Sequence, residues 1–94
     1  MTRKVRILPL ARRDRIRLEA FLQIKSPASA LRAAQAIAHA VQTLDEHAER
    51  GRLVSERGVR ELAVRFGRDG YVIQYTVTDS EVLVVRILHA REHR

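Results

Sequence analysis

The 94-residue chain is 46% hydrophobic and 31% charged, a composition that builds a compact soluble domain and excludes a disordered tail. It has no cysteine and no apolar run near the roughly 20 residues that span a bilayer, so disulfides, thiol catalysis and membrane insertion are not expected. We therefore expect one domain over residues 1–94, located in the cytoplasm. The apolar stretch near residues 7–10 is too short for a signal peptide.

The formal net charge of +7 is concentrated near the N-terminus. Residues 1–25 carry eight basic and two acidic side chains, whereas residues 71–94 carry three of each. Such a distribution favours a polyanion or an acidic protein as partner. Solubility charge in an arginine-rich chain explains it equally well, and both interpretations stay open.

Residues 4–8 alternate weakly and predict a short strand that ends at Pro9. From Leu10 the apolar period becomes that of a helix, which we expect to end at about Lys25. One face of this helix carries the apolar residues Ala11, Leu18, Phe21 and Leu22.

The same helix has a second apolar stripe on its opposite face, formed by Ile16, Ala20 and Ile24. A helix that is buried on one side does not need such a stripe. Either these residues dock a partner, or the helix is sandwiched between a sheet and a second helix.

Ser26 and Pro27 predict the start of a second helix, with serine as N-cap and proline at the first helical position. The connection is very short, which indicates a helical hairpin. We expect this helix to end around residues 49–52, where Gly51 would supply a left-handed cap. Its core stripe is predicted at Ala30, Ala34, Ile37, Val41, Leu44 and Ala48.

After a predicted surface loop at 52–59, three β-rich runs follow at about 60–66, 71–77 and 81–88. Gly67-Arg68-Asp69-Gly70 and Thr78-Asp79-Ser80 have the composition of tight turns. The order β-α-α-β-β-β predicts an α+β fold, with an αα-hairpin on one face of a small antiparallel sheet.

Arginines occupy strand positions in this sheet, although a desolvated guanidinium needs a partner or a wet surface. Strict alternation groups Leu62 with Val64 and Phe66, Tyr71 with Ile73, Tyr75 and Val77, and Leu83 with Val85 and Ile87. The face away from the helices is then predicted to carry Arg65, Gln74 and Arg86, with His89 and Arg91 just past the last strand. We interpret it as a binding surface; the alternative is an ordinary solvated face.

Six short segments carry a resemblance that covers nearly the whole chain. They are Ala11-Arg12-Arg13-Asp14, Pro27-Ala28-Ser29-Ala30, Gly51-Arg52, Arg60-Glu61-Leu62-Ala63-Val64, Tyr71-Val72-Ile73-Gln74-Tyr75 and Val85-Arg86-Ile87-Leu88-His89-Ala90-Arg91. In this order and at these separations the chain resembles the RelE/ParE superfamily, the toxins of bacterial type II toxin–antitoxin systems. The fold that the superfamily implies agrees with the one predicted above.

The RelE-like branch cleaves mRNA in the ribosome, and its residue pattern is incomplete here. That pattern has two cations on the second strand, an Arg after the Tyr that opens the third, an Arg beyond the last strand and a C-terminal Tyr or His-Tyr. The sequence offers Ala63 with Arg65, Val72 after Tyr71, Arg91, and no terminal Tyr. Metal-free cleavage needs fixed cations and an acid/base group, a role in which His89 or His93 could serve.

The sequence looks more like the ParE-like branch, which implies a non-enzymatic inhibitor of DNA gyrase that is neutralised by a cognate antitoxin. No cofactor, metal, membrane or small-molecule substrate is expected. The residues expected to contact the target or the antitoxin are Arg65, Gln74, Arg86, His89 and Arg91, and the antitoxin is expected to dock on Ile16, Ala20 and Ile24.

Two alternatives remain: a RelE-like ribosome-dependent mRNA endonuclease and a small basic nucleic-acid-binding module. The second is weakened by the scarcity of aromatic residues for base stacking, since the chain has only Phe21, Phe66, Tyr71 and Tyr75. His89 and His93 are spaced like half of a zinc site, but no further ligand accompanies them.

Overall fold

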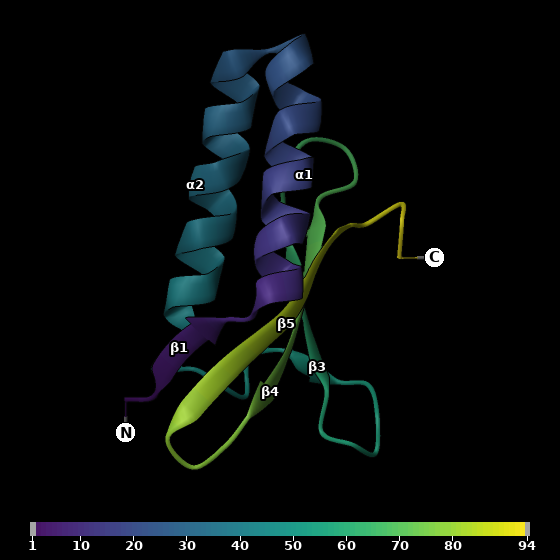
Figure 1. Cartoon of the computed structure of the whole chain (residues 1–94). Helices are drawn as coiled ribbons and strands as arrows, with labels where there is room; N and C mark the ends of the chain where they lie inside the picture. Colours follow the sequence, from purple (N-terminus) through teal and green to yellow (C-terminus); the bar gives the residue numbers. More distant parts are fainter. Residues whose placement is uncertain (1, 94) are drawn as a thin grey trace.

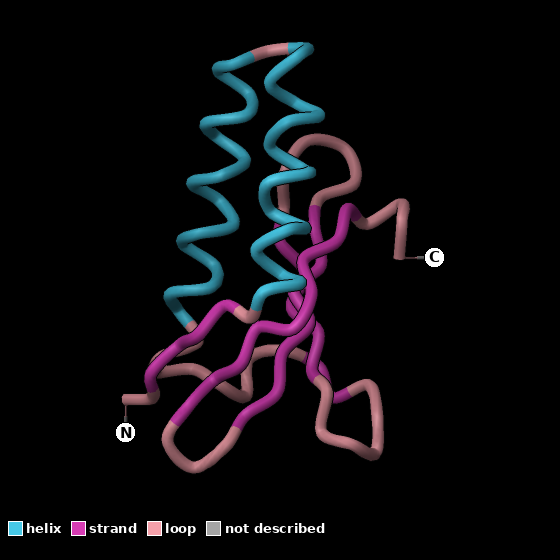
Figure 2. The backbone as a smooth tube through the Cα atoms, in the orientation of Figure 1, coloured by secondary structure: helices cyan, strands magenta, loops and turns pink. Residues whose placement is uncertain are grey.

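Two helices lie against one face of a five-stranded sheet in the computed structural model, which describes residues 2–93 (Figure 1; Figure 2). The elements are β1 (Lys4–Ile7), α1 (Pro9–Lys25), α2 (Pro27–Thr43), β2 (Arg52–Leu53), β3 (Arg60–Val64), β4 (Tyr71–Val77) and β5 (Glu81–His89). The predicted α+β class and helical hairpin are confirmed. Among the described residues, neither helix is long and apolar enough to cross a membrane.

The sheet has the strand order β1-β5-β4-β3-β2. Strands β3, β4 and β5 form the predicted antiparallel meander, which β2 extends, but β1 pairs with β5 in parallel, so the sheet is mixed and not purely antiparallel. The meander returns β5 beside β1 in the same direction, which the order of elements alone did not reveal. The short strand β2 lies within the segment predicted as a loop.

Ser26 joins the two helices and is both the C-cap of α1 and the N-cap of α2. Its Oγ accepts the Ser29 N–H at 3.2 Å, as the sequence predicted. Helix α2 ends at Thr43, earlier than expected.

The predicted left-handed cap at Gly51 is wrong, because Gly51 does not have a positive φ. Glycine is needed there for packing: a Cβ would lie 2.5 Å from the Tyr75 Oη. That hydroxyl is buried, donates to the Ala48 carbonyl at 2.8 Å and accepts the Gly51 N–H at 2.7 Å. Tyr75 therefore fastens the segment after α2 to the sheet.

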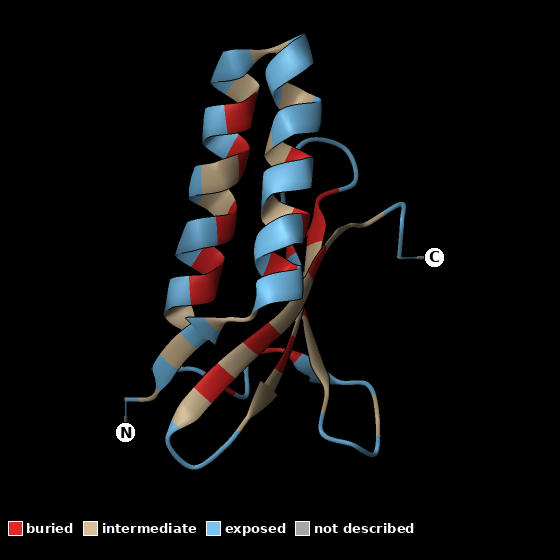
Figure 3. Cartoon of the chain, viewed as in Figure 1, coloured by how far each residue is buried: buried red, intermediate tan, exposed pale blue. Residues whose placement is uncertain are grey.

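The core lies between the hairpin and the sheet, where the buried positions of Figure 3 concentrate. Ala11 and Leu18 of α1 are buried as predicted, together with Ile37 and Val41 of α2. Phe21 is not in the core: it is 60% exposed.

The alternation predicted for β3 and β4 is confirmed, but that of β5 breaks in the middle of the strand. Gln74 pairs with Arg86 and Tyr75 with Val84, so Val85 is an extra residue that forms a bulge. Val82, Val84 and Ile87 consequently face the core, whereas the prediction had grouped Ile87 with Leu83 and Val85. One inserted residue reverses the facing of every residue beyond it.

Candidate functional site

Arg86 pairs with Gln74 in the β4–β5 ladder, which agrees with its predicted place on the outer face, but its guanidinium is bound to Asp14 of α1. Its Nε lies 2.8 Å from Asp14 Oδ2 and its Nη2 3.1 Å from Asp14 Oδ1. The Ile87 N–H donates to the same Oδ2 at 2.9 Å. Asp14 itself is 3% exposed.

Asp14 lies beside the part of β5 that has no neighbouring strand on one side. Strand β1 pairs with β5 only as far as Val84, so the second half of β5 is a free edge whose backbone donors need acceptors. Burial raises the pKa of Asp14, but the hydrogen bonds from Arg86 and the Ile87 N–H outweigh it and hold the pKa below its usual value. This ion pair joins α1 to the sheet and engages the Nε and Nη2 donors of Arg86, whose side chain is 36% exposed.

The outer face of the sheet carries a carboxylate on β3, opposite Gln74 of β4. Glu61 is largely buried in side-chain terms, at 13% exposure, and its Oε2 accepts the Gln74 Nε2–H at 2.9 Å. His93 Nε2 lies 2.7 Å from the same oxygen. Arg65 is exposed at the end of β3 and forms no ion pair with any residue from 2 to 93.

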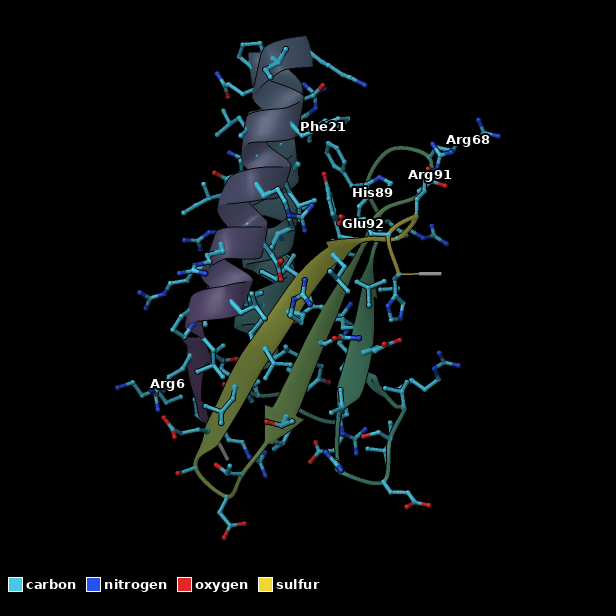
Figure 4. The ribbon with its side chains drawn as sticks, turned by 45° about the vertical axis from the view of Figure 1, so that its right-hand side comes forward. Arg6, Phe21, Arg68, His89, Arg91 and Glu92 are labelled. Carbon is cyan, nitrogen blue, oxygen red and sulfur yellow. The ribbon has the colours of Figure 1, made fainter. Side chains whose placement is uncertain are left out.

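His89 and Arg91 belong to a different surface, at the helix side of the sheet end (Figure 4). The His89 ring packs edge-on against buried Tyr71, with 5.7 Å between centroids, and its Nδ1 accepts the Arg91 N–H at 3.1 Å. Glu92 accepts the His89 N–H at 2.8 Å and binds Arg17 Nη1 at 2.8 Å. The five residues predicted to form one surface are thus divided among the outer face, the α1 junction and this end.

A groove of about 680 Å³ lies at that end, between the second half of α1, the β3–β4 turn and the C-terminal residues. Its apolar lining consists of Leu18, Leu22, Phe66 and Tyr71. The cationic side chains that line it are Arg17, Lys25, Arg68 and Arg91. Exposed Phe21 borders the groove with Lys25 Nζ 4.6 Å from its ring centroid. Sequence reasoning missed this groove because it assigned Phe21 to the core.

The second stripe of α1 is open to solvent: Ile16 is 64% and Ile24 is 89% exposed, and Ala20 is exposed as well. Of the two interpretations of this stripe, the sandwiched helix is therefore wrong. The three side chains therefore form a small exposed apolar stripe on the surface of α1.

The described residues offer no cluster of three or more histidine, aspartate or glutamate side chains that could hold a metal. His89 and His93 do not converge, because His93 pairs with Glu61 on the outer face while His89 faces the groove.

Comparison with known proteins places this fold in one family. The model of the family described as the ParE toxin of the type II toxin–antitoxin system parDE matches residues 5–94. Toxin RelE3 of Caulobacter vibrioides is 39% identical over 92 residues, which are 98% of this chain and 99% of the relative. Toxin RelE1 of the same organism is 37% identical over 94 residues and covers both chains completely.

Two solved structures share the architecture. A chain of the chromosomal ParDE toxin–antitoxin system from P. aeruginosa superposes with a TM-score of 0.83 at 24% identity, over 95% of this chain and 97% of that one. A chain of the toxin–antitoxin complex RelBE2 from Mycobacterium tuberculosis gives 0.63 at 23% identity, over 95% and 99%. The fold, the family match and the two toxin relatives show that this chain belongs to the ParE toxin family, within the RelE/ParE superfamily of type II toxin–antitoxin systems.

Proposed function

We propose that the protein is a ParE-like toxin that inhibits DNA gyrase by binding it and is neutralised by a cognate antitoxin. The observation that carries this proposal is the charge arrangement of the outer sheet face. Glu61 lies on this face beside Gln74, and Arg86 is paired with Asp14, so Arg65 is the cation that the described part of this face leaves without an acidic partner. A carboxylate beside a reacting phosphate would oppose cleavage, since phosphoryl chemistry needs charge compensation.

Two other positions on the outer face support the same reading. Ala63 is exposed and Val72 is half-buried, and they stand opposite each other in the β3–β4 ladder. These are the places where the RelE-like pattern has cations. Small and apolar side chains there suit a contact with a protein surface better than a contact with RNA.

The antitoxin is proposed to dock on the α1 stripe of Ile16, Ala20 and Ile24 and to continue into the neighbouring groove. An apolar helix face would cover the stripe, and acidic residues would meet Lys25, Arg68 and Arg91. A net charge of +7 favours such an acidic partner over a second copy of the chain.

Expression in the absence of any antitoxin tests this function. We expect growth arrest with induction of the DNA-damage response, relieved by co-expression of a small acidic protein encoded beside this gene. Purified protein added to a reconstituted translation system should leave the mRNA intact. Rapid cleavage in the ribosomal A site would overturn the gyrase assignment in favour of the RNase.

A RelE-like endonuclease remains the second candidate, because of the 2.7 Å contact between His93 and Glu61. A carboxylate oriented toward an imidazole is an arrangement used for general acid/base catalysis. In that case His93→Gln should abolish mRNA cleavage while the fold is retained.

A further inference from the structure

Strand β1 is an edge strand of the sheet, with β5 as its neighbour on the inner side (Figure 1). The Lys4 and Leu8 N–H groups donate to the Ser80 and Val84 carbonyls, both at 3.0 Å, and so point toward β5. Backbone groups alternate in direction along a strand. The N–H and C=O groups of Val5 and Ile7 therefore point away from the sheet, toward the free edge.

One backbone hydrogen bond within the chain already forms at this edge of β1. The Arg3 N–H, which points the same way as those of Val5 and Ile7, donates to the Asp45 carbonyl at 2.8 Å. The segment after α2 thus supplies one strand-like bond and then turns away. The next two backbone donors that point toward this edge, the Val5 and Ile7 N–H groups, are available to an added strand.

A hollow of about 350 Å³ adjoins this edge on its helix side. Val5 and Ile7 line it together with Ile37 and Val41 of α2, and Arg3 and Arg15 are among its polar side chains. Arg15 forms no ion pair within residues 2–93. An apolar side chain entering from an added strand would fill the hollow, and neighbouring carboxylates would meet the two arginines.

The opposite face of β1 is also cationic, since Lys4 and Arg6 are exposed there (Figure 4), although Arg6 Nη1 makes a long contact of 3.5 Å with Glu81 Oε2 on β5. Positive side chains on an edge strand prevent two like edges from pairing, because cross-strand like charges destabilise a ladder. A second copy of this chain is therefore excluded as the occupant, and an acidic strand is favoured.

We propose that β1 receives an extended acidic segment of the antitoxin as a sixth strand of the sheet. The inference rests on the proposed function, because it gives that partner a second site beyond the α1 stripe. The Val5 and Ile7 groups bond the added strand. Its apolar residues alternate with acidic ones, the former entering the hollow and the latter meeting Lys4 and Arg6.

Amide hydrogen exchange tests the inference, with the purified small acidic protein encoded beside this gene as the probe. In the complex, exchange of the Val5 and Ile7 amides should slow at least tenfold. The Leu8 amide serves as internal control, because it is already bonded to Val84 in the free protein. If a complex forms and the Val5 and Ile7 rates are unchanged, this inference fails and the proposed function stands. If no complex forms, both fail.

Two variants test the added strand independently of hydrogen exchange, through the antitoxin Kd. Val5→Pro removes the outward N–H and keeps the Lys4 and Leu8 bonds to β5, and we expect the antitoxin Kd to rise about tenfold. Lys4→Glu combined with Arg6→Glu should weaken binding by a similar factor without touching the backbone. Arg57→Glu, in the exposed loop before β3, is the matched charge control and should leave the Kd unchanged. Equal Kd values for all three proteins would contradict the added strand.

Discussion

Arg65 and Arg86 look alike in the sequence, since each is an arginine in an apolar strand, yet the structure gives them different environments. Arg86 is held by a buried carboxylate at the junction of α1 and β5. Arg65 is exposed at the end of β3 and has no ionic partner in the described chain. A guanidinium in a small sheet can thus serve the fold or the surface, and the deciding feature is a carboxylate on a distant element.

The same division separates the two sides of the sheet. On the helix side, Asp14 and the Tyr75 hydroxyl each satisfy buried backbone groups, so their loss should destabilise the fold. On the outer face, Arg65 contacts no charged residue that its loss would leave unpaired. The comparison therefore predicts large stability effects on one side and effects on binding alone on the other.

The largest effect is expected for Asp14→Ala. It removes the acceptor of two Arg86 bonds and of the Ile87 N–H, and should lower the free energy of unfolding by about 3 kcal/mol. Urea unfolding measures the difference. Asp69→Ala, which deletes a loose 3.9 Å contact with exposed Arg91, is the control and should change stability by less than about 0.5 kcal/mol. Equal losses for the two variants would break the comparison.

Tyr75→Phe should cost somewhat less, about 2 kcal/mol, because it leaves the Ala48 carbonyl and the Gly51 N–H without their buried partner. The ring stays in place, so no cavity forms. Thermal unfolding should show a lower Tm with unchanged secondary structure. Tyr71→Phe makes the matched comparison, since no hydrogen bond to its hydroxyl is seen among residues 2–93 and its Tm should shift less.

Acid should weaken the Asp14 junction selectively. Its pKa is lower in the folded state than in the unfolded chain, so its contribution is complete above about pH 4 and is lost as the pH falls through the folded value. The stability difference between the parent protein and Asp14→Asn should therefore shrink from pH 5 toward pH 2. A constant difference over this range would mean that the Asp14 pKa is not lowered by folding.

The smallest effect on stability is expected for Arg65→Ala, within about 0.5 kcal/mol of the parent protein. Its effect on partner binding should be larger, about tenfold in Kd, since exposed arginines are frequent interface anchors. Calorimetric titration with the antitoxin or with gyrase measures it. If Arg65→Ala unfolds the protein or binds both partners normally, Arg65 is not the surface cation described here.

Local sequence rules predicted much of this fold. Ser26 and Pro27 marked the helix junction, and alternation placed the β3 and β4 side chains correctly, because caps and pleats depend on neighbouring residues. The bulge at Val85 and the parallel pairing of β1 depend on contacts between distant segments, and local patterns do not encode them. The same is true of the Asp14–Arg86 pair, whose members are 72 residues apart.

The most direct test of the account compares two assays on one purified sample. DNA gyrase supercoiling and mRNA integrity in a reconstituted translation system are measured over the same range of toxin concentrations, for the parent protein and Arg65→Ala. We predict that the parent protein inhibits supercoiling, that Arg65→Ala needs about tenfold more protein for the same inhibition, and that neither cleaves mRNA. Cleavage of mRNA with supercoiling unaffected would contradict the central claim that this surface binds and does not cut.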